Sequence, residues 1–405
     1  MKVRRVRQQL VSQPLPDVAG EVTRQLDRLR ADVRGKSIAL TAGSRGIANL
    51  AAITRAAGNW LKAHGAHPFL VPCMGSHNGA TASGQRAMIE SLGLTEEAMG
   101  LPIRSSMDVV QLGTVATGDV WMDRACHEAD GVLVINRVKL HTCFSGPVQS
   151  GLMKMMVVGM GKIRSAETFH STPTARMKDM ILEMGDVILQ SGRILAGLAI
   201  LEDGIDQTAE IHLVEPQELP EREIELLETH RGYFPRLPLE DLNVLVVGAI
   251  GKTYSGTGMD TNVIGYRGVR SFEDLESPRI RVIAALRLAT ASQGNAIGVG
   301  LADFITRDLR DAIDEEKTLI NVLTTGDMIR AKIPATYPND EALLQAIERR
   351  YGASGWAFIP NTLHLETLFV TPDLAEKLTG NARCVVEEAP LYVTYEGGAL
   401  QLNFD

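Results

Sequence analysis

Short runs of apolar residues alternate with amphipathic stretches in the first half of the chain. The runs at 36–43, 67–75 and 130–141 predict β-strands, because each is short and bounded by glycine or polar residues. The segments 47–65 and 81–93 repeat their apolar positions with helical spacing. Strands alternating with helices indicate βαβ units, and therefore a parallel sheet with helices on both faces.

The pattern changes in the middle of the chain. The runs 193–203 and 207–216 predict a pair of strands, and Glu202 and Asp203 at the end of the first could bind a metal or lie in solvent. A charged, proline-containing stretch follows at 219–242. We place a domain boundary near residue 235 because this composition is typical of a connecting segment.

The second half resumes the α/β pattern. An apolar strand is expected at 243–251 and another apolar run lies at 279–289, with helices at 315–328 and 340–352 and a terminal hairpin at 390–404. We therefore predict an α/β protein of two domains. Residues 1–235 would form a Rossmann-like domain with a mostly parallel sheet and the catalytic loops. Residues 236–405 would form a second α/β domain that closes the active-site cleft.

Composition and charge narrow the class of function. The 405 residues are 45% hydrophobic and 22% charged, as in ordinary globular proteins. A net charge of -8, without a stripe of basic and aromatic residues, argues against a nucleic-acid partner. No apolar run is long enough to span a membrane, and the basic N-terminus lacks the apolar core of a secretory signal. Four cysteines without paired spacing indicate a cytoplasmic protein: Cys73, Cys126, Cys143 and Cys384.

Polar side chains follow three of the predicted strands. Arg45 follows the first strand and His77 follows the second, in a glycine-rich turn. Asn136, Lys139 and His141 follow the third. Because ligands of such sheets bind at the carboxyl ends of the strands, these loops are expected to converge on one site. Taken alone, Arg45 equally fits a surface cap, and His77 equally fits a histidine that bonds the backbone.

Lys154 lies in an unusual setting, within the apolar run 152–156. Burying an ammonium group costs several kcal/mol unless it is paired or neutralised. Lys154 therefore either extends its charge to the surface over the methionines or has a function inside.

Two glycine-rich segments, 41–46 and 145–151, place backbone N–H groups where they attract phosphate or carboxylate. We assign Ser44, Ser150 and Gly151 to the binding of an anionic cofactor. Neither segment has the order of a P-loop, and 157–163 lacks the third glycine of a dinucleotide fingerprint. Both ATP and an ordinary NAD-binding fold are therefore disfavoured.

Taken together, these motifs resemble the nickel-pincer lactate racemase family, in particular its lactate racemase-like homologues. The resemblance rests on AGSRGIAN, PCMGSHNGATASGQ and NRVKLHT, and on Lys154 and His170, which are sixteen positions apart. It covers most of the chain and is strongest over residues 36–175.

The resemblance implies a cofactor and a set of roles. Lys154 would carry, through a thioamide link, a nicotinate-derived mononucleotide that holds nickel, and an amide-type bond would remove the charge of its amine. His170 would bind the nickel. Arg45 would bind the substrate carboxylate, and His77 and His141 would be the two acid–base groups. The implied reaction is racemisation or epimerisation of a small 2-hydroxy acid by hydride removal and return through a 2-keto acid.

Some residues depart from lactate racemase itself. Ala42, Asn78 and a longer interval between His141 and Lys154 all change the surroundings of the substrate or cofactor, so the side chain of the 2-hydroxy acid stays open.

A glycine-rich loop in the second domain carries three further candidates. Lys252 is assigned to cofactor binding, and Asp260 and Asn262 are candidates for closing the cleft. The same loop equally fits a structural turn.

We expect a cytoplasmic enzyme that depends on cofactor-synthesis enzymes for maturation, so protein from an ordinary host would lack the cofactor. The oligomeric state is open. The alternatives are an NAD- or metal-dependent 2-hydroxyacid dehydrogenase, lysine Schiff-base chemistry, and a non-catalytic nucleotide- or phosphate-binding protein.

Overall fold

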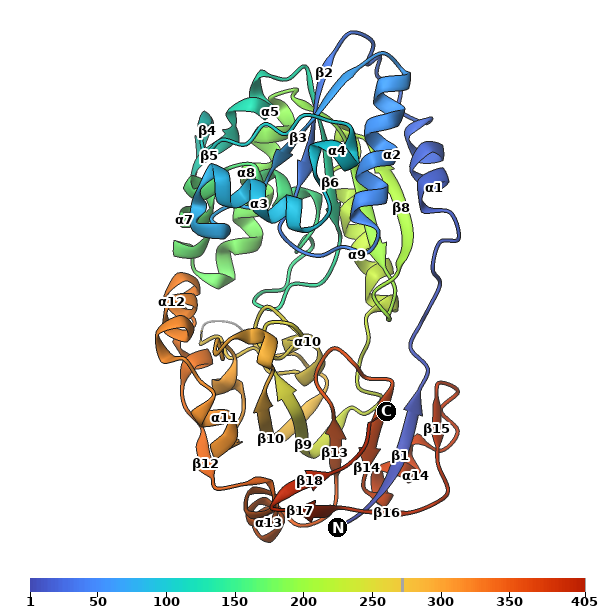
Figure 1. The fold of residues 1–405 in the computed structure, drawn as a ribbon, viewed down its shortest axis with the longest axis vertical. Helices are drawn as coiled ribbons and strands as arrows, with labels where there is room; N and C mark the ends of the chain where they lie inside the picture. The colour runs from blue at the N-terminus through green and yellow to red at the C-terminus, as the bar shows by residue number, and fades with distance from the viewer. Residues whose placement is uncertain (271–272, 405) are drawn as a thin grey trace. The chain divides into compact units, whose positions relative to one another are not determined.

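The computed structural model describes residues 1–270 and 273–404. The chain divides into two compact units (Figure 1), one formed by Val11–Phe234 and the other by Met1–Leu10 together with Pro235–Asp405. This division differs from the predicted one, which placed the first ten residues in the N-terminal domain. They lie in the other unit because β1 (Lys2–Gln8) pairs antiparallel with β14 (Thr367–Val370) and β15 (Cys384–Val386).

The unit Val11–Phe234 is built on a mixed, mostly parallel sheet with the strand order β3-β2-β6-β7-β8. Four neighbouring strands are parallel: β3 (His67–Pro72), β2 (Ser37–Ala42), β6 (Gly131–Arg137) and β7 (Ile194–Glu202). The edge strand β8 (Thr208–Val214) pairs antiparallel with β7. The alternation of apolar runs and helices predicted this sheet.

Helices cover both faces of this sheet. Figure 1 shows α1 (Val18–Leu26) and α2 (Leu50–Ala63) on one side, with α7 (Lys162–Ser171) and α8 (Met177–Gln190) on the other. The shorter helices and a hairpin complete the unit: α3 (Ala82–Ser91), α4 (Glu96–Met99), α5 (Arg124–Glu128), β4 (Val109–Val115) and β5 (Gly118–Asp123). One buried cluster joins α1 and α2 to alternate residues of the strands, such as Leu40, Leu133 and Leu198. This two-residue spacing is expected when one face of a strand points into the core.

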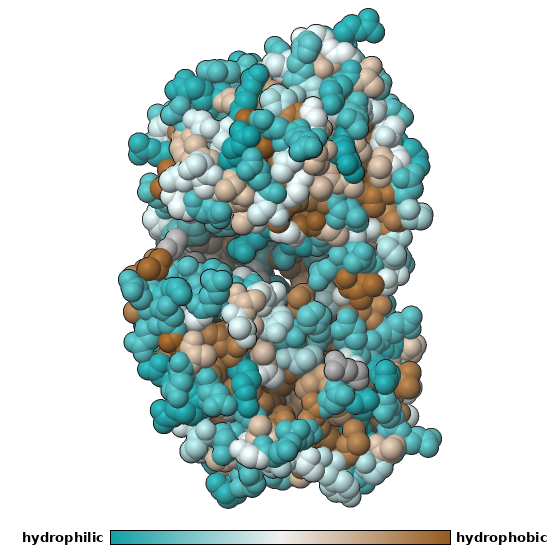
Figure 2. Space-filling model, in the orientation of Figure 1, coloured by the Kyte–Doolittle hydropathy of each residue, from teal (hydrophilic) through white to brown (hydrophobic). Residues whose placement is uncertain are grey.

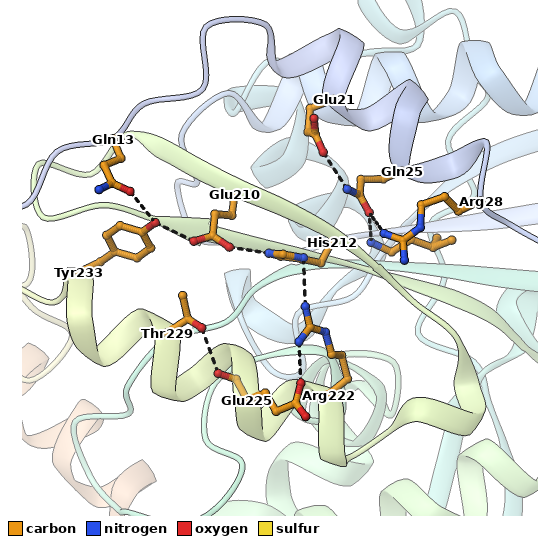
Figure 3. A network of polar contacts seen from close by, with 11 residues as sticks. Gln13, Glu21, Gln25, Arg28, Glu210, His212, Arg222, Glu225, Thr229 and Tyr233 are labelled. Carbon is orange, nitrogen blue, oxygen red and sulfur yellow. Dashed lines mark hydrogen bonds and ion pairs between the residues drawn. The ribbon is translucent and has the colours of Figure 1, made fainter.

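The charged stretch predicted as a connecting segment forms a helix, α9 (Glu221–Tyr233). A polar network ties α9 to β8 (Figure 3): the Tyr233 hydroxyl donates to Glu210 at 2.6 Å, and the other Glu210 oxygen lies 2.7 Å from His212 Nε2. Arg222, also on α9, contacts His212 Nδ1 at 3.4 Å. These contacts hold α9 against β8.

The second unit is also a mixed sheet, with the strand order β12-β11-β10-β9-β13-β14-β1-β15, and β16 (Leu391–Tyr392) pairs with β1. Its parallel half contains β9 (Asp241–Ile250), β10 (Arg279–Leu288), β11 (Phe304–Thr306), β12 (Ala335–Tyr337) and β13 (Trp356–Ile359). The helices are α10 (Thr261–Ile264), α11 (Arg307–Asp311), α12 (Glu315–Thr325), α13 (Asp340–Tyr351) and α14 (Pro372–Leu378). The predicted terminal hairpin is present as β17 (Thr394–Glu396) and β18 (Ala399–Gln401).

The visible face of the molecule is mainly hydrophilic, with apolar residues scattered over it (Figure 2). Among the described residues, no helix combines the length and the hydropathy needed to cross a membrane.

Candidate active site

The loop that carries Arg45 leaves the end of β2 and is fastened to the neighbouring strands. The Ala48 amide donates to Glu202 at 2.6 Å, and the Thr208 hydroxyl donates to the Ala48 carbonyl at 2.9 Å. Glu202 is buried and also pairs with Arg137 at the end of β6. Glu202 therefore anchors the loop. This structural role differs from the two that were expected for Glu202, a metal ligand or an acid in solvent. Asp203 instead closes the following turn by accepting the amides of residues 205 and 207.

Arg45 itself keeps solvent-exposed surface. Burial by neighbouring protein lowers the pKa of its guanidinium, and the positive charge of Arg137 lowers it further. Two guanidinium groups close enough to repel each other make this edge of the sheet attractive to an anion such as a carboxylate.

His77 follows β3 and is linked directly to the Arg45 loop. Its Nδ1 forms a short hydrogen bond with the Ser44 hydroxyl. Two residues earlier, the Gly75 amide donates to the Gly159 carbonyl at 3.4 Å, and a Cβ atom at Gly75 would lie 3.2 Å from Ala166. The His77 loop therefore packs closely on the segment between Lys154 and His170. Ser44, predicted to contact a cofactor, contacts His77.

Lys154 ends the short helix α6 (Leu152–Lys154), and a π-helical turn over Met155–Gly159 follows it. Such turns are frequent at functional sites because they displace the side chains around them. The Nζ atom lies 2.7 Å from His141 Nε2 and 5.3 Å from the centre of the Phe169 ring. Burial lowers the pKa of Lys154 to about 8, and the charges of Arg45 and Lys139 lower it too, whereas Cys143 opposes them.

The structure thus brings Lys154 and His141 together, although 13 positions separate them in the chain. The methionines beside Lys154 pack in the core, as expected, since Met153 approaches Gly185 of α8 closely.

His170 lies near the end of α7, next to Phe169, and the two ring centres are 5.7 Å apart. Burial lowers the pKa of His170, and the positive charge of Lys154 lowers it further. The imidazole is therefore neutral near pH 7, the state in which its nitrogen can bind a metal. Within the described chain, no three His, Cys, Asp or Glu side chains are grouped to hold a metal ion. A single imidazole suits a square-planar metal whose other donors come with a cofactor.

Ser150 and Gly151, assigned to a cofactor, have clear structural partners. The backbone of Ser150 pairs with that of Lys139 at 2.7 and 3.2 Å. A Cβ atom at Gly151 would lie only 2.3 Å from a carboxylate oxygen of Glu223. Glycine at this position therefore makes room for Glu223, and a contact with a cofactor stays a prediction.

Glu223 is a residue of this site that the sequence did not single out. It is buried on α9, and its carboxylate accepts a hydrogen bond from the Met153 amide at 2.8 Å. Burial raises the pKa of Glu223 to about 7, although the amides of Met153 and Leu152 oppose the rise. The available signal was its place on the apolar face of α9, at helical spacing from Leu226 and Leu227.

A second unpredicted residue, Lys162, supports the end of β3. It is fully buried with a positive φ of 52°, and its Nζ lies 3.2 Å from Asp123 and 3.2 Å from Gln85 Oε1. The same amine donates to the Pro72 carbonyl, and Gln85 donates to the Gly75 carbonyl at 2.8 Å. These bonds hold the strand end from which the His77 loop leaves.

The candidates of the second unit lie close together in the chain, and Asn262 belongs to the short helix α10. Lys252 donates to Asn321, and the Asp260 side chain accepts the Asn262 amide at 2.9 Å to cap α10. Their part in binding a cofactor or closing a cleft stays a prediction.

Neither family models nor the sequences of curated proteins give a match to this chain. Among solved structures, the lactate racemase apoprotein from Thermoanaerobacterium thermosaccharolyticum is similar, with a TM-score of 0.53 and 14% sequence identity. The alignment covers 88% of this chain and 94% of that chain, so it includes both units. The resemblance indicated by the sequence motifs is therefore confirmed at the level of the fold: the chain is an α/β protein with the fold of lactate racemase.

Proposed function

We propose that this protein is a racemase or epimerase of a small 2-hydroxy acid that works with a nickel-pincer nucleotide attached to Lys154. The observation that carries the proposal is the partly buried amine of Lys154, which lies 2.7 Å from the imidazole of His141 on a fold shared with lactate racemase. An amine in such surroundings is poorly suited to be a permanent charge and well suited to form a neutral bond.

The side chains present fit the cofactor that the fold implies. Lys154 would hold it through an amide-type bond, which removes the charge that burial disfavours. His170, neutral because its pKa is lowered, would bind the nickel. When bound, the cofactor supplies a reversible acceptor for the hydride on the α-carbon of the substrate.

The chain's own residues would bind the substrate and move its hydroxyl proton. Arg45 would hold the carboxylate through two parallel hydrogen bonds. His77 and His141 would each take or return the proton of the hydroxyl, one for each enantiomer, because the two enantiomers place that group on opposite sides. The hydrogen bond between the Ser44 hydroxyl and His77 Nδ1 would fix the orientation of this imidazole.

The test is co-expression with the cofactor-synthesis enzymes, followed by intact-mass and metal analysis and chiral chromatography of a panel of 2-hydroxy acids. The unaltered chain should carry a mass adduct with nickel and interconvert the enantiomers of at least one acid. Lys154→Ala should lose both, whereas Lys36→Ala, a change at an exposed lysine, should keep both. An adduct retained by Lys154→Ala, or a loaded enzyme that turns over only with added NAD, would overturn the proposal.

A further inference from the structure

The hydrogen bonds of His141 define which of its nitrogens carries a proton. The backbone N–H of Cys143 donates to Nδ1 at 3.1 Å, so Nδ1 accepts through its electron pair and carries no hydrogen. A neutral imidazole carries one proton, which must then lie on Nε2. Nε2 is the atom that faces Lys154 Nζ at 2.7 Å.

A donor at Nε2 requires an acceptor at Nζ. An ammonium group has three hydrogens and no electron pair, so it cannot accept a hydrogen bond, whereas a neutral amine can. If Lys154 were charged in this arrangement, two donors would face each other across 2.7 Å. The pair of bonds at His141 therefore selects the uncharged form of Lys154.

Burial and two neighbouring positive charges also disfavour the ammonium form of Lys154. Arg45 from the loop after β2 and Lys139 after β6 repel a positive charge, and burial disfavours it most. The positive charge of Lys154 in turn lowers the pKa of His170 on α7. Cys143 and the ring of Phe169, 5.3 Å away, favour the ammonium. The sum of these effects lowers the pKa of Lys154 to about 8. Half of the Lys154 side chains are therefore uncharged at that pH, whereas an ordinary lysine reaches this point near pH 10.4.

We infer that His141, with its proton on Nε2, holds Lys154 as an uncharged, nucleophilic amine that an activated carboxyl group can acylate. In that step the hydrogen bond from His141 Nε2 opens, and the electron pair of Nζ that accepted it forms the bond to the acyl carbon. The bond to the leaving group breaks, and the leaving group takes its electron pair. One proton leaves Nζ for solvent, because Nε2 of His141 is already protonated. This second role of His141 goes beyond the proposed function, since it concerns the protein before any cofactor is attached.

The first experiment is trace labelling of the folded, cofactor-free protein with acetic anhydride between pH 6 and 10, read by peptide mass spectrometry. Acetylation of Lys154 should be half-maximal near pH 8, below the midpoints of peptides with exposed lysines in the same sample. A midpoint for Lys154 equal to that of the exposed lysines would overturn the inference.

Two variants of Cys143 distinguish the effect of its backbone N–H from the effect of its side chain. Cys143→Pro removes the N–H that keeps the proton off Nδ1, so the labelling midpoint of Lys154 should rise by about one pH unit or more. Cys143→Ala keeps that N–H and should leave the midpoint unchanged or slightly lower. Equal midpoints in the two variants, with both folded by circular dichroism, would contradict the role of His141.

The tautomer can also be measured without a variant at Cys143. Nitrogen NMR of 15N-histidine-labelled protein, with His141→Ala to assign the signal, should show His141 protonated at Nε2; protonation at Nδ1 would overturn the inference. A chain that shows this tautomer and labels at Lys154, but racemises no 2-hydroxy acid when loaded, would overturn only the proposed function.

Discussion

The buried carboxylate of Glu223 accepts a hydrogen bond from the backbone N–H of Met153 at 2.8 Å, one residue before Lys154. A carboxylate at the start of a helical turn satisfies amides that have no partner within the helix. Here the acid comes from α9, far along the chain, and reaches the turn because Gly151 has no side chain. The position of Lys154 therefore depends on a helix outside the loops that carry the predicted site.

Glu223 should make stability depend on pH. Its pKa is raised from 4.5 to about 7 on folding, so between these values the folded chain binds more protons than the unfolded chain. Its free energy of unfolding should then fall as pH rises through this window, by about 1 to 3 kcal/mol. Glu223→Gln, which keeps an oxygen for the amides, should lose this part of the dependence. Urea unfolding at pH 5 and pH 7.5 measures it; identical pH dependence in both proteins would contradict the assignment.

Gly151→Ala should be destabilising, because the new Cβ would lie 2.3 Å from the Glu223 carboxylate. Overpacking of this kind costs about 1 to 3 kcal/mol. Gly232→Ala is the matched control, because a Cβ at that position of α9 meets nothing within 4 Å. Thermal unfolding should show a lower midpoint for Gly151→Ala alone. If the two variants have the same midpoint of thermal unfolding, Glu223 is not held against Gly151 as described.

Lys162→Met should destabilise the protein by about 3 to 5 kcal/mol, because it leaves the charge of Asp123 buried and unpaired. The exposed change Lys36→Met should stay within about 0.5 kcal/mol. The double variant Lys162→Met with Asp123→Leu should regain part of the loss, since no charge is then buried. Chemical denaturation of the three proteins tests this, and a double variant less stable than Lys162→Met would argue against the ion pair.

Arg45→Lys should weaken binding of the 2-hydroxy acid, because lysine cannot form the two parallel hydrogen bonds of a guanidinium group. On the proposed function, KM should rise about tenfold or more while kcat changes less. The amount of nickel-bound adduct, measured in the same samples, should stay the same. An unchanged KM would remove Arg45 from substrate binding.

Ser44→Ala should lower kcat by about tenfold or more while leaving the covalent adduct in place, because His77 loses the bond at Nδ1 that orients its ring. His77→Ala should abolish racemisation with the adduct again retained. Steady-state kinetics and intact mass, measured together, separate an effect on the histidine from an effect on cofactor loading. Loss of the adduct in Ser44→Ala would instead support the predicted contact of Ser44 with the cofactor.

Elements with strong periodicity were predicted well. The runs that became β2, β3 and β7 are short and apolar because these strands are buried in the sheet, and their length and flanking residues distinguish them from helices. Two of the segments that were missed have an apolar pattern that charged residues interrupt. The strand β1 carries several arginines, and α9 buries Glu223 and His230 on its inner face.

The sequence by itself determined the α/β class and the order of the strongly apolar strands and amphipathic helices, because the apolar pattern is a local property of the chain. It also placed Arg45, His77 and His141 after three strands of one parallel sheet. Only the tertiary structure decided that Lys154 contacts His141 and that Ser44 contacts His77. It also decided that Glu223 and Lys162 form hydrogen bonds that hold the neighbouring segments. Hydrogen bonds between residues far apart in sequence, and the pKa shifts caused by burial, depend on which segments pack together, and no spacing along the chain encodes that packing.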